Sequence, residues 1–104
     1  MKFVASFKYN DIKITSHAQE RAAERTDIET LDELCQAAEK SITEGIDALA
    51  DPTLRELVYA YAKRHNNSGM YAYKGYVYVF KDDALVTIIP IGWLASLTKD
   101  GHIE

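Results

Sequence analysis

The sequence predicts one α+β domain, because its hydrophobic periodicity changes twice along the chain. Residues 2–8 alternate apolar and polar side chains in the manner of a strand with one buried face. Two capping-box signatures then precede stretches of helical periodicity, and the period returns to two from Met70 onward. With 104 residues, the chain is long enough for one two-layer core and too short for two. We therefore expect an N-terminal strand or hairpin, three helices and a three-stranded antiparallel meander, joined in one curved sheet within a single domain, 1–104.

The N-terminal segment has the pattern strand, turn, strand, helix. Asn10-Asp11 supplies a turn signal, after which residues 12–15 can return as a second strand. Ser16 with Gln19 matches a capping box, so a helix is expected from His17 onward. At about 100° per residue, one side of this helix carries His17, Glu20, Arg21, Glu24 and Arg25. The other side carries Ala18, Gln19, Ala22 and Ala23, which suits close packing against a sheet.

The second helix is expected over residues 31–49. Thr30 and Glu33 repeat the capping box, and apolar residues then recur at intervals of three and four. Gly45 weakens this helix by up to about 1 kcal/mol relative to alanine and marks a point where it can kink. Cys35 lies in the apolar stripe, so we interpret it as a buried structural thiol rather than a nucleophile.

The third helix is expected from Pro52 to His65. Asp51-Pro52 combines an N-cap residue with a proline at the first helical position. Lys63, Arg64 and His65 fall in the last turn, where positive charge suits the helix dipole. His65 therefore has a structural explanation.

Tight turns are expected to join three further strands, at residues 70–74, 76–81 and 84–91. The last strand is apolar on both faces apart from Thr87, as expected of a central strand in a covered sheet. Pro90 closes it, because proline cannot continue a central ladder. Trp93, Leu94 and Leu97 are then expected to fold back over an open end of the core.

Composition and charge narrow the functional classes. The chain has 12 basic and 16 acidic residues, and a formal net charge of −4 disfavours indiscriminate binding to nucleic acid. A local basic patch is compatible with that balance. The single cysteine excludes an internal disulfide and fits a reducing compartment. Lys8, Asn10 and Asp11 interrupt the N-terminal apolar residues, so we expect no signal peptide, no membrane span and a cytoplasmic protein.

Metal and cofactor chemistry has little support in the sequence. His17, His65 and His102 are far apart, and there is no closely spaced histidine or cysteine pair. A glycine-rich phosphate loop, a dinucleotide fingerprint and a serine or cysteine nucleophile motif are equally absent. We therefore expect neither a bound metal nor a cofactor.

The remaining candidate chemistry is acid–base catalysis with electrostatic support from His17, Arg21, Arg25 and a hydroxyl such as Thr87. An imidazole can exchange a proton with the 2′-hydroxyl or the leaving oxygen of RNA, while guanidinium groups stabilise the five-coordinate phosphorus. Such a set suits a ribonuclease that needs no metal. The same residues also fit an ordinary solvated helix with ion pairs such as Arg21 with Glu24.

Four tyrosines between residues 71 and 78 form a second candidate feature. Tyrosine rings can stack on bases, which contributes about 1 to 3 kcal/mol per base. On this basis Tyr71, Tyr73 and Lys74 are candidate contacts for RNA. An ordinary half-buried strand carries tyrosines in the same pattern, so a structural interpretation stands beside the RNA-binding one.

Two segments resemble a known group of proteins: residues 12–25, with Ile14-Thr15-Ser16-His17-Ala18-Gln19-Glu20-Arg21 and Arg25, and residues 76–90, which end Val86-Thr87-Ile88-Ile89-Pro90. They resemble small phage and bacterial domains that open with Thr-x-His-Ala-x-x-Arg-x-x-x-Arg and end on a Val-Thr-Val strand. Those domains in turn look like the barnase, EndoU, colicin and RelE superfamily, whose toxins cleave RNA on a curved antiparallel sheet. The resemblance implies His17 as general acid or base, Arg21 and Arg25 as phosphate binders, and Thr87 as a polar group facing them.

The competing hypothesis is a non-enzymatic interaction module of phage or mobile-element origin. Such a protein would bind a host protein or an antitoxin, or would associate with itself. The net negative charge favours this class, and the acidic second helix with Glu33 and Glu39 is its candidate docking face. The position of His17, Arg21, Arg25 and Thr87 relative to a common pocket separates the two hypotheses.

Overall fold

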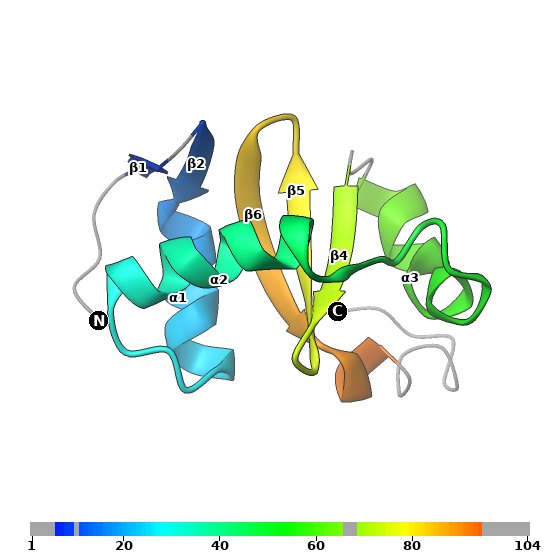
Figure 1. Cartoon of the computed structure of the whole chain (residues 1–104). Helices are drawn as coiled ribbons and strands as arrows, with labels where there is room; N and C mark the ends of the chain where they lie inside the picture. The colour runs from blue at the N-terminus through cyan, green and yellow to red at the C-terminus, as the bar shows by residue number, and fades with distance from the viewer. Residues whose placement is uncertain (1–5, 10, 66–68, 95–104) are drawn as a thin grey trace.

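The computed structural model describes residues 6–9, 11–65 and 69–94. Within them, six strands form one mixed sheet in the order β1-β2-β6-β5-β4-β3. Its strands are β1 (Ser6–Tyr9), β2 (Ile12–Thr15), β3 (Ile46–Asp47), β4 (Gly69–Tyr73), β5 (Tyr76–Lys81) and β6 (Ala84–Pro90). The helices are α1 (Ser16–Arg25), α2 (Leu31–Thr43) and α3 (Pro52–His65), followed by a single helical turn at 91–94. The α+β class expected from the sequence is thus confirmed (Figure 1).

The N-terminal hairpin pairs β1 with β2 in antiparallel fashion. Asp11 occupies the left-handed region at φ 68°, a conformation that aspartate tolerates in tight turns. β2 then lies parallel to β6, with Lys13 opposite Ala84 and Ile14 opposite Leu85. The expected N-terminal strand began at residue 2, and residues 2–5 lie outside the described part of the chain. The parallel pairing joins hairpin and meander into one sheet and was not anticipated.

The cap of α1 is Thr15 rather than the expected Ser16. Thr15 has extended backbone angles, and its Oγ1 accepts a hydrogen bond from the Ala18 N–H at 3.0 Å. The same hydroxyl donates to the Leu85 carbonyl oxygen of β6 at 3.0 Å. Ser16 is the first helical residue and is exposed. Thr15 is favoured because, as the last residue of β2, it reaches both the helix and the neighbouring strand.

The N-cap role of Thr30 at the start of α2 is confirmed, whereas the expected length of the helix is wrong. Thr30 Oγ1 accepts from the Glu33 N–H at 3.1 Å and donates to Glu33 Oε1 at 3.0 Å. The helix ends at Thr43, and the chain continues into β3 beside β4. A Cβ on Gly45 would overlap the carbonyl oxygens of Ser41 and Ala72. Gly45 therefore allows the chain to pass from helix to sheet edge at close range.

The third helix and the meander follow the expected order. Asp51 caps α3, since its Oδ2 accepts from the Leu54 N–H at 3.0 Å. β4, β5 and β6 pair as antiparallel neighbours, with a register shift between Val79 and Phe80. Because Val79 pairs with Thr87 and Phe80 with Leu85, Val86 is the extra residue of a β-bulge.

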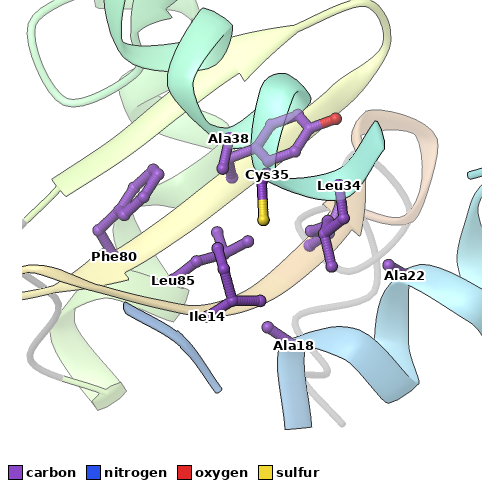
Figure 2. Close-up of a cluster of buried hydrophobic side chains, with 10 residues drawn as sticks. Ile14, Ala18, Ala22, Leu34, Cys35, Ala38, Phe80 and Leu85 are labelled. Atoms are coloured by element: carbon purple, nitrogen blue, oxygen red, sulfur yellow. The ribbon is translucent and has the colours of Figure 1, made fainter. Parts of the chain in front are cut away.

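Helices cover both faces of the sheet. One face carries α1 and α2, and α2 crosses the strands in Figure 1. The buried members of this first core are Ile14, Ala18, Ala22, Leu34, Cys35, Ala38, Tyr78, Phe80, Leu85 and Ile88, most of which are labelled in Figure 2. The opposite face carries α3 and the 91–94 turn over the second core, Ala48, Val58, Met70, Ala72, Val77, Val79, Ile89 and Leu94.

Two expectations about single side chains are confirmed. Cys35 is 1% exposed and its Sγ points into the first core (Figure 2), where burial and then the charge of Asp32 raise the pKa of the thiol. Leu94 folds back into the second core, while neighbouring Trp93 remains 43% exposed. Leu97 lies outside the described residues. Among the helices of the described segments, none has the length and apolar character needed to cross a bilayer.

Candidate functional site

The polar side of α1 faces outward, as the spacing indicates, but its charges already have partners. His17 is exposed in the first turn. Arg21 Nη1 donates to Glu24 Oε2 at 2.8 Å and lies 3.8 Å from Glu20 Oε1. Two carboxylates therefore neutralise the Arg21 guanidinium, which weakens its attraction for phosphate.

Arg25 has a structural position at the sheet edge. Its Nη1 donates to the Ile88 carbonyl oxygen of β6 at 3.1 Å. The guanidinium carbon also lies 4.7 Å from the centre of the Trp93 ring, within the range of a cation–π contact. These contacts tie the end of α1 to β6 and to the 91–94 turn.

Thr87 does not face the arginines in the manner implied by the resemblance. Its side chain is buried at 3% exposure. In the antiparallel register Thr87 lies opposite Val79, and directly paired residues point to the same face. Val79 belongs to the core under α3, whereas the buried alanines of α1 belong to the other core. The bulge at Val86 therefore turns Thr87 away from the face covered by α1.

An open hollow of about 530 Å³ lies elsewhere, between α2, the loop at 26–28 and the β4–β5 turn. Residues of three segments line it: Thr26, Asp27, Ile28, Glu33, Gln36, Ala37, Lys40, Tyr73, Lys74, Tyr76 and Tyr78. Two of the three proposed RNA contacts, Tyr73 and Lys74, belong to this lining, and none of His17, Arg21, Arg25 and Thr87 does. We call it the tyrosine hollow.

The tyrosines of the hollow differ in burial. Tyr73 and Tyr76 are half-buried, while Tyr78 is 3% exposed and forms the inner wall. The Tyr73 and Tyr78 rings lie 6.5 Å apart at 57°, and Lys74 Nζ is 5.4 Å from the Tyr73 ring centre. Burial, followed by Tyr73 and Tyr76, raises the pKa of Tyr78 to about 12. The phenol of Tyr78 is therefore neutral over the physiological range.

Tyr71, the third proposed RNA contact, packs against the first core, as Tyr73 and Tyr76 also do. Its ring meets Phe80 edge to face, with centroids 5.7 Å apart and planes at 73°. It does not belong to the lining of the hollow. The structural interpretation of the tyrosines thus applies fully to Tyr71 and in part to Tyr73 and Tyr76, which also pack against the first core while lining the hollow.

Of the four residues of α2 in the lining, Gln36, Ala37 and Lys40 were not selected from the sequence, and Glu33 was selected only as part of a protein-docking face. Glu33, Gln36, Ala37 and Lys40 follow intervals of three, one and three, so they share one side of the helix. That spacing is visible in the sequence. The sequence does not show that this side of α2 faces the β4–β5 turn. The sequence therefore could not predict that these residues and the tyrosines line one hollow.

Metal binding gains no support from the described residues, among which no group of three or more histidine, cysteine, aspartate or glutamate side chains could hold an ion. The side chain of His65 and the whole of His102 lie outside the described part. No family model, curated protein or solved structure matches the chain. The resemblance to the toxin superfamily therefore stays a prediction.

Proposed function

We propose that this protein binds single-stranded RNA in the tyrosine hollow, as a binding protein rather than through catalysis on α1. The observation that carries the proposal is the meeting of Tyr73, Tyr76, Lys74 and Lys40 around one open cavity. Aromatic rings that accept stacked bases beside cations that contact phosphate are the usual components of a single-strand site. A volume of about 530 Å³ lies within the range of ligand cavities.

A local site is compatible with the acidic chain. The formal net charge of −4 repels RNA at long range, so affinity must come from stacking and from few phosphate contacts. Unstacked bases of single-stranded RNA suit such a site, because both faces of a splayed base are open to aromatic side chains. Duplex RNA presents its backbone instead and would find only two lysines here.

Catalysis by α1 has weaker support, for a geometric reason. A general base needs the phosphate-binding groups within reach of the same scissile bond. Arg21 is held by glutamates, Arg25 by β6 and Trp93, and Thr87 lies on the other face of the sheet. His17 is thus an exposed imidazole without an assembled partner set around a pocket.

The test is fluorescence anisotropy with a labelled RNA of about eight nucleotides, a length typical of single-strand sites. We expect Tyr73→Ala to weaken binding by about fivefold or more, from loss of one stacked base. Tyr59→Ala is the matched control, since Tyr59 is 56% exposed on α3 at the opposite face. Equal RNA affinities of the wild type, Tyr73→Ala and Tyr59→Ala would contradict the proposal.

A second variant guards against indirect effects of Tyr73→Ala on folding. Ala37→Leu adds bulk on the α2 side of the hollow without removing a polar group, and leucine is a good helix former. We expect Ala37→Leu to weaken RNA binding while its thermal unfolding remains cooperative. Full affinity in this folded variant would place the RNA elsewhere.

A further inference from the structure

The tyrosine hollow has a different charge at each end of its α2 wall. Glu33 belongs to the first turn of α2 and Lys40 to its last, which separates their Cα atoms by about 10 Å along the axis. Asp27 lines the hollow from the loop before α2 and adds a second carboxylate. Lys74 adds a second cation from the β4–β5 turn.

This polarity fits a ligand with hydrogen-bond donors at one end and an anion at the other. The hollow carries two carboxylates as well as two ammonium groups, so a plain run of phosphates would meet repulsion at Asp27 and Glu33. A nucleotide avoids that conflict when its base edge meets the carboxylates and its phosphate meets the lysines.

The identity of the base follows from what a carboxylate can accept. An ionised carboxylate has acceptors only, so it pairs with N–H groups and repels carbonyl oxygens or bare ring nitrogens. Guanine offers two adjacent donors on its pairing edge, the ring N1–H and the N2 amino group, which match the two oxygens of one carboxylate. Adenine and cytosine place an amino group beside a bare ring nitrogen, and uracil flanks its one N–H with two carbonyls.

A hydrogen bond within the cap of α2 orients Glu33. Its Oε1 accepts from the hydroxyl of the N-cap residue Thr30 at 3.0 Å, which orients the Glu33 side chain before a ligand arrives. Half-buried Tyr73 and Tyr76 supply ring surface in the same hollow, and the small side chain of Ala37 on α2 leaves room opposite them. A flat base can therefore enter between helix and turn.

Building on the proposed RNA-binding function, we propose that the tyrosine hollow selects guanine, with Glu33 and Asp27 accepting from its pairing edge and Lys40 and Lys74 near the phosphate. Stacking on the tyrosines supplies affinity that every base shares. The carboxylates supply the preference, because hydrogen bonds to a charged acceptor are the stronger kind.

The experiment titrates the full chain with GMP, AMP, CMP and UMP and measures the dissociation constants by calorimetry. We expect GMP to bind at least about fivefold more tightly than UMP, the lower end for one bidentate pair. Glu33→Gln keeps a similar shape but places a donor against guanine, so it should lower GMP affinity. UMP affinity should stay equal or rise, because the variant removes a carboxylate that repels the uracil carbonyls. Asp27→Asn repeats the test outside α2, in case Glu33→Gln disturbs the helix cap.

The outcomes separate this inference from the proposed function. Equal binding of the four nucleotides, blocked by Ala37→Leu, would overturn guanine selection and leave RNA binding intact. A GMP preference that survives both Glu33→Gln and Asp27→Asn would also overturn it. Failure of GMP to bind, with RNA binding still sensitive to Ala37→Leu, would reject only the inference, whereas loss of both would reject the function as well.

Discussion

His17 extends into solvent from the first turn of α1, outside the tyrosine hollow. We expect His17→Ala to change the free energy of unfolding by less than about 0.5 kcal/mol, as for most exposed sites. RNA incubated in chelator should stay intact with the wild-type protein and with the variant, and both should bind RNA equally. Gel analysis of the RNA checks this, and cleavage by the wild type that His17→Ala abolishes would restore the catalytic hypothesis.

Tyr78 makes the stability of the fold sensitive to alkaline pH. Folding raises its pKa from 10.0 to about 12, so the folded state favours the neutral phenol. The contribution of this pKa difference to the free energy of unfolding is complete below pH 10 and is lost as the pH rises towards 12. Two pKa units correspond to at most about 2 to 3 kcal/mol.

Tyr78→Phe provides the comparison, because it keeps the ring and removes the titrating hydroxyl. We expect the wild type to lose stability more steeply than Tyr78→Phe above pH 10, as measured by urea unfolding at several pH values on both sides of 10. Parallel curves for the two proteins would show that the phenol does not limit alkaline stability.

At the level of the elements, the junction of β2 and α1 depends on one hydroxyl. Thr15 Oγ1 caps α1 and also bonds to Leu85 of β6. We expect Thr15→Ala to lower the free energy of unfolding by about 1 to 2 kcal/mol, from the lost cap and the lost link to the sheet. Ser16→Ala is the matched control one residue away, and chemical denaturation should show little change. A larger loss of stability in Ser16→Ala than in Thr15→Ala would mean that Ser16, not Thr15, caps the helix.

Gly45 is required where α2 gives way to β3. We expect Gly45→Ala to destabilise the protein by about 1 to 3 kcal/mol, because the added methyl group meets two backbone carbonyl oxygens that cannot move independently. Gly92→Ala is the control, since a Cβ there meets nothing within 4 Å. Thermal unfolding of both variants measures the difference. Equal stability of Gly45→Ala and the wild type would mean that the junction can relax.

Local chemistry explains which elements the sequence could predict. Thr30 with Glu33 and Asp51 with Pro52 fix the starts of α2 and α3 through contacts within four residues, and both starts are confirmed. The end of α2 depends on Ala72, which is distant in sequence and excludes any side chain at Gly45. The apolar stripe in the sequence continues to Leu49 and gives no sign of that contact. The helix expected from the sequence was therefore longer than the observed α2.

For the whole molecule, the bulge in β6 and the two-sided cover of the sheet decide which side chains meet. One extra residue, Val86, places Thr87 on the side of α3, away from α1. Strict alternation along a strand cannot reveal such a shift. The tyrosine hollow likewise joins α2 to the β4–β5 turn across more than thirty residues of sequence, so Tyr73 and Lys74 were found one by one, without their partners on α2.

The charge of the whole chain leads to a prediction about salt. Each phosphate that a single strand places against a cation contributes about −0.7 to the slope of log affinity against log salt. With Lys40 and Lys74 as the cations of the hollow, we expect a slope of only about −1.4. Lys74→Gln should reduce it by about 0.7, measured by anisotropy over a salt series. Lys81→Gln, exposed at the far end of β5, should leave it unchanged. A much steeper slope, or equal effects of both variants, would require a wider basic surface than this acidic chain offers at the tyrosine hollow.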